Sequence, residues 1–151
     1  MGAGGNDLLD PIALEVLQVL LGEDLLGRPQ VPLNKDAMAR LIGDKRVLVT
    51  GAGGSIGAEL VRQVAALNPA SLTLLDNSEY ALYRINLEVS EDLSKLPCRH
   101  VIGDVRDAKR IDEVFLTAAP EIVFHAAALK HVPMVEDNLI EGIAINTLGS
   151  I

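Results

Sequence analysis

The sequence predicts an α/β fold in which helices connect the parallel strands of a doubly wound sheet. From Lys45 onward, short apolar runs alternate four times with segments of helical periodicity. Three glycines spaced three residues apart separate the first apolar run from the first helical segment. Alternation of this kind requires crossover connections, which place consecutive strands parallel to one another. A chain of 151 residues suits one such domain with a leader before it.

Residues 1–44 are interpreted as a leader of helical and extended pieces. Residues 8–21 place apolar side chains on one broad helical face, which predicts a short amphipathic helix. Pro29 and Pro32 then impose extended backbone. A second short helix is expected next, with Asn34 as its N-cap and Gly43 at its end. The sheet domain is therefore expected over residues 45–151.

Four strands and four helices are expected within that domain. The strands are residues 46–50, 71–76, 98–104 and 121–127, and the first is almost continuously apolar, as strands buried on both faces are. Each helix has apolar residues that are expected to face the sheet. These are Ile56, Leu60, Val64 and Leu67 in the first helix, Leu82, Ile85 and Val89 in the second, Ile111, Val114, Phe115 and Ala118 in the third, and Leu139, Ile143 and Leu148 in the fourth.

Composition and charge exclude several classes of protein. The formal net charge of −8 disfavours nucleic acid as a partner, because a phosphate backbone requires a positive surface. Cys98 is the single cysteine, so no internal disulfide can form and a reducing, cytoplasmic setting is expected. Its side chain is interpreted as a small buried hydrophobe. No apolar run is long enough to cross a bilayer, so no membrane contact is expected from this chain.

The glycine turn after the first strand is typical of a site for a dinucleotide. Gly51 can adopt the tight backbone that leaves the strand, Gly54 leaves room for a pyrophosphate, and Gly57 allows the helix to pack closely on the sheet. The helix that follows directs its free N–H groups and the positive end of its dipole at the same space. A glycine triplet alone is a weak signal, but here it follows an expected strand and opens an expected helix.

An acidic residue at the end of the second strand strengthens this interpretation. Asp76 lies 19 residues after Gly57, close to the separation at which an acid binds the adenosine ribose. Its carboxylate would accept hydrogen bonds from the ribose hydroxyls and repel a 2′-phosphate, so NAD is expected and NADP is less favoured. The alternative is that Asp76 only caps the next helix.

The spacing T-G-x-x-G-x-x-G is similar to that of the extended short-chain dehydrogenase/reductase superfamily. The segments VLVTGAGGSIGAEL, LLDNSEYALY, GDVRD, FHAAALKHVPMVEDN and INTLGS resemble the bacterial UDP-N-acetylglucosamine 4,6-dehydratases of polysaccharide biosynthesis. The resemblance covers residues 23–151 and implies a Rossmann-type sheet that is incomplete at its C-terminal side.

The resemblance also implies a set of cofactor-binding residues. It places the pyrophosphate along the glycine turn, the ribose at the acid that ends the second strand, the adenine after the third strand and the nicotinamide after the fourth. A lysine beyond the fourth strand is expected near a cofactor phosphate or ribose, and an asparagine of the next helix is expected to support the site. The implied residues are Gly51, Gly54, Ser55, Ile56, Gly57, Asp76, Asp104, Val105, Ala126, Ala127, Ala128, Lys130 and Asn146.

Simpler interpretations stay open for several of these positions. Asp104 can be a turn residue before the next helix, Lys130 can be a solvated loop residue, and the three alanines can reflect tight packing alone. His125, inside an apolar strand, is interpreted as a hydrogen-bonded core histidine rather than as a base or ligand. The cysteine and histidines have no zinc-like spacing, so no metal is assigned.

The resemblance implies a dehydratase that removes a hydride from C4 of a UDP-sugar, eliminates water across C5 and C6, and returns the hydride to C6. Its acid–base groups and most of its UDP pocket follow a fifth strand, so no catalytic residue is expected in this chain. A nucleotide-sugar 4-epimerase and a non-catalytic NAD-binding module are the alternatives. The open apolar sheet edge predicts either self-association or marginal stability. The resemblance implies a longer protein that can be anchored to the inner membrane by segments upstream.

Overall fold

The computed structural model describes residues 35–93 and 96–150, which belong to one compact unit, Lys35–Ile151. The helix expected over residues 8–21, the prolines after it and the Asn34 cap lie outside the described residues. Within the described residues, no helix is long and apolar enough to cross a membrane.

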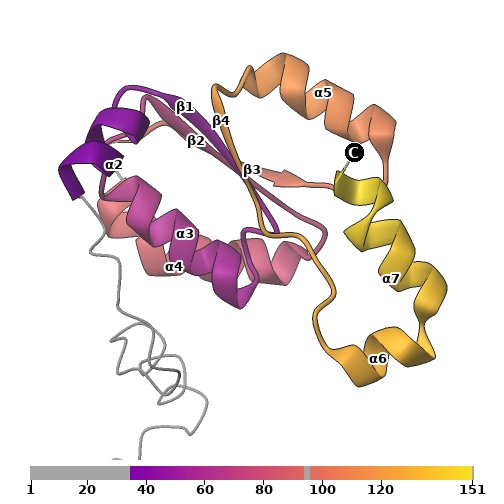
Figure 1. Ribbon diagram of the computed structural model, residues 1–151. Coiled ribbons are helices and arrows are strands. Elements are labelled where there is room, and N and C mark those ends of the chain that lie inside the picture. Colours follow the sequence, from indigo (N-terminus) through magenta and orange to yellow (C-terminus); the bar gives the residue numbers. More distant parts are fainter. Residues whose placement is uncertain (1–34, 94–95, 151) are drawn as a thin grey trace, which may run out of the picture. The chain divides into compact units, whose positions relative to one another are not determined.

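The elements follow the expected alternation (Figure 1). In chain order they are α2 (Lys35–Ile42), β1 (Arg46–Thr50), α3 (Ser55–Ala65), β2 (Ser71–Asp76), α4 (Glu79–Leu93), β3 (Cys98–Ile102), α5 (Ala108–Ala118), β4 (Ile122–His125), α6 (Val132–Asp137), α7 (Leu139–Asn146) and the 3-10 turn η1 (Leu148–Ser150). Helix α2 ends where Gly43 was expected to end it, and the Gly43 amide donates to the carbonyl of Ala39. Because Ile42 is buried in the core, α2 packs with the sheet although the sequence groups it with the leader.

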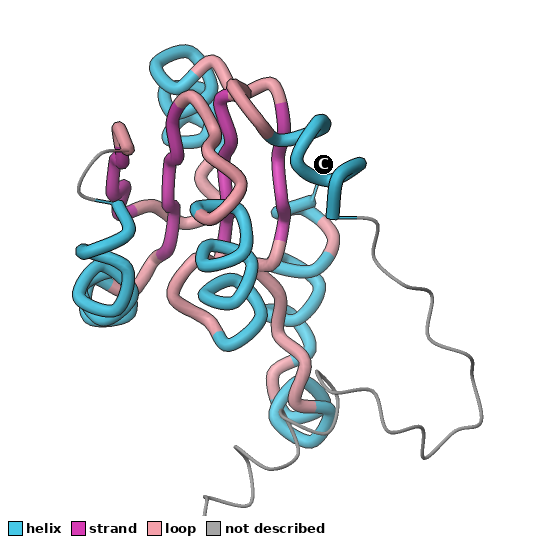
Figure 2. The backbone as a smooth tube through the Cα atoms, turned by 90° about the vertical axis from the view of Figure 1, so that its left-hand side faces the viewer, coloured by secondary structure: helices cyan, strands magenta, loops and turns pink. Residues whose placement is uncertain are grey.

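The described strands form one parallel sheet in the order β3-β2-β1-β4, and they lie side by side in Figure 2. The chain moves outward from β1 to β2 and β3, and then returns to the other side of β1 to form β4. The order of the strands therefore reverses between β1 and β4. In open α/β sheets, ligands bind in the crevice at such a point, outside the carboxyl ends of the strands.

Each face of the sheet has its own buried cluster. Helices α3 and α4 cover one face, while α5 and the segment of α6 and α7 lie on the other side (Figure 1). The larger cluster contains Val47, Val49, Leu72 and Leu74 of the strands together with inward residues of α3 and α4. Leu82, Ile85 and Val89 of α4 are buried, which confirms their expected orientation. The smaller cluster consists of Leu48, Leu75, Val101 and Val114, with Val105 and Ile111 packed against it.

In α3 and α5, one residue of each helix was expected to face the sheet and is exposed instead. Ile56 is 59% exposed, because α3 turns Gly57, Val61 and Val64 toward the sheet. The close approach of Gly57 to the glycine turn sets this rotation, and a count of apolar side chains cannot detect a contact made by glycine. Phe115 of α5 is 43% exposed, while Val114 next to it is buried in the smaller cluster with Leu48, Leu75 and Val101.

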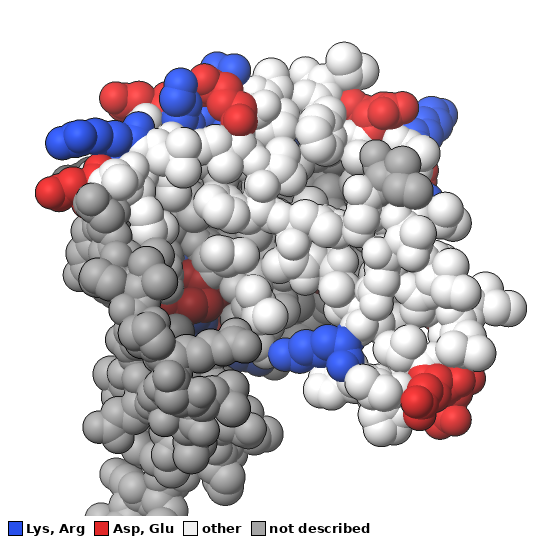
Figure 3. Space-filling model, in the orientation of Figure 1, with Lys and Arg blue, Asp and Glu red and all other residues white. Residues whose placement is uncertain are grey.

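The last expected helix is interrupted, and its apolar residues are exposed. Helix α6 ends before Asn138, whose backbone is not helical and whose side-chain amide donates to the carbonyl of Met134. Leu139, Ile143 and Leu148 were expected to be buried, but each is more than 60% exposed, since no described element packs over them. Figure 3 shows few charged side chains over this part of the molecule. The prediction that the chain associates with itself stays open.

Candidate functional site

The candidate site is a cleft at the carboxyl ends of the strands. Register aligns these ends, since Thr50 lies opposite both Leu75 and His125, and Asp76 lies opposite Ile102. The residue that follows each strand therefore lines the same space. The cleft contains about 590 Å³ of empty space, counting the part open to solvent. It is lined by Gly51, Gly54, Leu75, Asp76, Asn77, Gly103, Asp104, Val105, Ala126, Ala127, Ala128, Leu129 and Ile145.

The glycine turn forms one wall of the cleft, and its glycines have different surroundings. Gly51 has a φ of +64°, and a Cβ there would lie 2.6 Å from the backbone nitrogen of Ala127. Gly57 packs under the turn, where a Cβ would lie 1.9 Å from the carbonyl oxygen of Gly51. A Cβ on Gly54 would meet only that same oxygen, at 3.3 Å. The absence of a side chain at Gly54 thus leaves space open on the cleft side of the turn.

Helix α3 begins at this open space. Gly54 is its N-cap, with φ −72° and ψ 166°, and it has no side chain that could bond to the amides of the first turn. Those amides have no partner inside the helix, and the helix dipole adds partial positive charge at the same end. An anionic group in the cleft would satisfy these donors, as phosphate, sulfate and carboxylate groups do at the N-termini of helices.

Asp76 is buried at the end of β2 and fixes the glycine turn to the start of α4. Its Oδ2 accepts a hydrogen bond from the amide of Gly53 at 2.9 Å, and its Oδ1 accepts one from the amide of Ser78 at 2.9 Å. The cap of α4 is Ser78, whose hydroxyl accepts from the amide of Ala81. Each carboxylate oxygen has two lone pairs, so Asp76 keeps one acceptor position on each oxygen for a ligand in the cleft.

Asp104 and Val105 follow β3 and line the opposite part of the cleft. The carboxylate of Asp104 accepts from the amide and from the guanidinium of Arg106. These contacts with Arg106 lower the pKa of Asp104, so the carboxylate is charged at neutral pH. The carbonyl of Asp104 also accepts from the amide of Asp107, which caps α5. Asp104 is thus a turn residue and also a residue of the cleft.

The loop after β4 supplies a wall of backbone and small side chains. Ala126, Ala127 and Ala128 all line the cleft, and the amide of Ala126 donates to the carbonyl of Thr50. Asn146 of α7 holds the end of this loop: its Oδ1 accepts from the amide of Leu129 at 2.8 Å, and its Nδ2 donates to the carbonyl of Leu129 at 2.9 Å. Asn146 itself does not line the cleft, but it supports the loop that does.

The structure brings most of the expected residues together but places some beside the cleft. Gly57 is buried beneath the turn, while Ser55, Ile56 and Lys130 are exposed and do not line the described cleft. Gly53 was not expected to matter, yet a Cβ there would lie 2.3 Å from that of Ala81. Five lining residues were also missed. Asn77 and Gly103 directly follow β2 and β3, and the residue after each strand lines the cleft, so the sequence could have revealed them. Leu75, Leu129 and Ile145 do not follow a strand directly, so nothing in the sequence indicated their place in the cleft.

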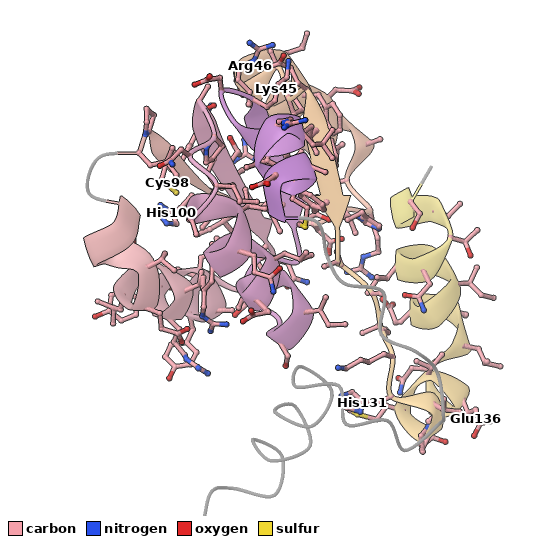
Figure 4. All side chains as sticks on the ribbon, turned by 60° about the vertical axis from the view of Figure 1, so that its left-hand side comes forward. Lys45, Arg46, Cys98, His100, His131 and Glu136 are labelled. Carbon is pink, nitrogen blue, oxygen red and sulfur yellow. The ribbon has the colours of Figure 1, made fainter. Side chains whose placement is uncertain are left out.

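The histidines and the cysteine lie outside the cleft. His125 is hydrogen-bonded as expected, with Nδ1 2.7 Å from the Thr50 hydroxyl and Nε2 3.1 Å from the Ser150 hydroxyl. The expectation that it is a core residue is wrong, because β4 is an edge strand and His125 is exposed. Cys98 and His100 lie on β3, whereas His131 lies at α6 (Figure 4). Among the described residues, no group of histidines, cysteines and acids could hold a metal ion.

Together, the strand order, the glycine turn at the reversal point and the acid at the end of β2 define a Rossmann-type dinucleotide-binding fold. Residues 47–151 match the family described as "Polysaccharide biosynthesis protein". The chain belongs to this family. Proteins similar to this chain in sequence include nucleotide-sugar dehydratases and epimerases.

Three comparisons illustrate the relationship. The capsular polysaccharide biosynthesis protein CapD of Staphylococcus aureus is 44% identical over 129 residues, which are 85% of this chain and 22% of CapD. An inverting UDP-N-acetylglucosamine 4,6-dehydratase of Campylobacter jejuni is 30% identical over 73% of this chain and 31% of its own length. The UDP-glucose 4-epimerase of Bifidobacterium longum, solved with NAD+ and UDP, has a TM-score of 0.58 and 28% identity over 68% of this chain and 30% of its own. The chain thus spans less than a third of the length of these proteins.

Proposed function

We propose that this chain is the NAD-binding portion of a nucleotide-sugar 4,6-dehydratase that acts on UDP-N-acetylglucosamine in bacterial surface polysaccharide synthesis. The observation on which this depends is the open space at Gly54, bounded by the start of α3 on one side and Asp76 on the other. A diphosphate joined to a ribose matches that pair of features, since one end needs amide donors and the other needs a carboxylate acceptor.

The residues of the cleft fit an extended dinucleotide. The first-turn amides of α3, at Ser55 and Ile56, would donate to the pyrophosphate, and the free lone pairs of Asp76 would accept from the adenosine ribose. Asp104 would accept from the adenine amino group. The backbone of the Ala126–Ala128 loop would border the nicotinamide, with Lys130 available at the rim. When bound, the nicotinamide supplies the hydride acceptor and donor.

Asp76 also supports NAD over NADP. Its carboxylate is buried and held by two backbone amides, so it cannot easily turn away from a 2′-phosphate. Placing two negative groups together there would cost binding free energy because like charges repel strongly in a partly desolvated site. No lysine or arginine lines the described cleft that could neutralise the added charge.

A nucleotide-sugar 4-epimerase is the second candidate, and the similarity to the B. longum 4-epimerase favours it. The 30% identity to an inverting UDP-N-acetylglucosamine 4,6-dehydratase, over 73% of this chain, favours the dehydratase. Both reactions use the same cofactor cleft, so the residues described here serve either one. The two reactions differ in their products: a dehydratase product has lost one water, whereas an epimerase product has the mass of its substrate. Mass spectrometry of UDP-N-acetylglucosamine incubated with the longer protein distinguishes them.

Calorimetry of this chain with NAD, NADP and UDP-N-acetylglucosamine, each titrated separately, tests the binding proposal. We expect measurable NAD binding, weaker NADP binding, little binding of the sugar nucleotide and no turnover. Equal affinity for the two dinucleotides would remove the role given to Asp76. Absence of NAD binding by folded protein would contradict the proposed function itself.

A further inference from the structure

Arg106 contacts the cleft residue Asp104 with two of its three guanidinium nitrogens. Nε donates to Oδ1 at 3.0 Å and to Oδ2 at 3.1 Å, and Nη2 donates to Oδ2 at 2.7 Å. The third nitrogen, Nη1, pairs with Glu141 of α7. The guanidinium is a rigid planar fork, so two-point pairing of this kind fixes the plane of a carboxylate as well as its position.

Counting lone pairs shows what remains of Asp104 for a ligand. Oδ1 accepts from the backbone amide of Arg106 at 2.9 Å and from Nε, which uses both of its lone pairs. Oδ2 accepts from Nη2 and shares the Nε–H donor with Oδ1, so it keeps one acceptor position for a ligand. Asp104 therefore offers one fixed acceptor to the cleft, where a freely rotating carboxylate would offer several.

The connection to α7 makes Arg106 more than a surface partner of Asp104. The same helix contributes Ile145 to the wall of the cleft. The turn after α7 also packs on the loop after β3, since a Cβ on Gly149 would lie 2.7 Å from a methyl carbon of Val105. Glu141 and Gly149 therefore attach the loop that contains Asp104 at two points, on either side of Ile145.

We propose that Arg106 is a positioning residue that makes the cleft selective for a 6-aminopurine by holding Asp104 in one orientation. This inference rests on the proposed function. An adenine amino group would donate to the one free acceptor of Asp104. Hypoxanthine has a carbonyl oxygen at that position, which the carboxylate repels, and its nearest donor is N1–H. A carboxylate that could turn would reach N1–H, and the Arg106 fork prevents that turn.

The experiment compares the dissociation constants of NAD and nicotinamide hypoxanthine dinucleotide in this chain by calorimetry. In the unmodified chain we expect NAD to bind at least about tenfold more tightly, the effect of one hydrogen bond to a charged group. In Arg106→Ala and Arg106→Lys we expect the ratio to fall to within about threefold of one, because neither side chain forms the fork. In Glu141→Gln we expect an intermediate ratio.

Arg84→Ala is the matched control, because it removes an exposed arginine that pairs with Glu88 on α4. It should leave the ratio unchanged. If both dinucleotides weaken equally in the Arg106 variants, Arg106 is a structural residue and the inference is overturned. If Arg106→Ala does not fold by circular dichroism, the ratio in Arg106→Lys decides by the same criterion. Equal binding of both dinucleotides by the unmodified chain overturns this inference alone, and binding of neither overturns the proposed function.

Discussion

Gly54, the N-cap of α3, and Gly57, in its first turn, lie three residues apart, and the structure predicts different effects for an alanine at each. At Gly54 the new methyl group would have one close neighbour, the Gly51 carbonyl oxygen at 3.3 Å, and φ of −72° suits any residue. At Gly57 the same methyl group would lie 1.9 Å from that oxygen and 2.7 Å from its carbon, both backbone atoms. Gly54→Ala should therefore affect the ligand, and Gly57→Ala should affect the fold.

The magnitudes follow from these surroundings. For Gly54→Ala, a poorer N-cap and a less flexible unfolded chain each change the free energy of unfolding by about 0.5–1 kcal/mol in opposite directions, so stability hardly changes. The methyl group would obstruct a pyrophosphate and cost at least one charge-assisted hydrogen bond, which raises the dissociation constant for NAD by about 10- to 100-fold. For Gly57→Ala, relief of the overlap requires the backbone to move and costs about 3 kcal/mol, which lowers the melting temperature by about 10 °C.

Thermal unfolding by circular dichroism and NAD titration by calorimetry measure the two effects independently. The comparison has an internal control, because both variants add the same methyl group at the start of the same helix. Unchanged NAD affinity in a folded Gly54→Ala protein would refute the assignment of the pyrophosphate to this turn. A Gly57→Ala protein as stable as the original would refute the steric argument.

Three further predictions concern single residues. Asp76→Asn should reduce the preference for NAD over NADP by about tenfold in calorimetry, because the new amide cannot repel a 2′-phosphate and one oxygen is lost; an unchanged preference would contradict this. Burial raises the pKa of Cys98 to about 11 from 9.0, so at pH 8 alkylation by iodoacetamide should be about 100-fold slower in native protein than in urea. Equal rates would show that the thiol is not desolvated. Asn146→Ala should weaken NAD binding by about tenfold without removing a cleft residue, since it frees the Leu129 loop. An unaffected affinity would mean that the loop holds its position without this bridge.

The sequence predicts the order of strands and helices well, because the apolar runs and the glycine turn are local signals. The inward faces were predicted for α4 and only partly for α3 and α5. Helix α3 is oriented by Gly57 and not by its large side chains, so Ile56 points outward. The Asn138 break between α6 and α7 depends on a side-chain bond to the backbone of Met134, which apolar periodicity does not show.

The candidate site shows the same division between local and distant signals. Gly51, Gly54 and Asp76 were detectable because their spacing is fixed within one strand–helix–strand unit. The contacts of Arg106 with Glu141 and of Asn146 with Leu129 span 35 and 17 residues, and they exist only once α7 has packed against the loops after β3 and β4. No spacing rule anticipates contacts of this kind.

Strand register is what unites these residues into one cleft. Because Thr50 lies level with Leu75 and His125, and Asp76 with Ile102, each strand ends at the same edge and delivers its next residue there. A slip of one residue between β1 and β2 would turn Asp76 to the other face of the sheet and break its bond to Gly53. The same bond holds the glycine turn against the end of β2. Asp76 and the glycine turn are therefore one mechanical unit, so under the proposed function a substitution in either should alter the affinity contributed by both.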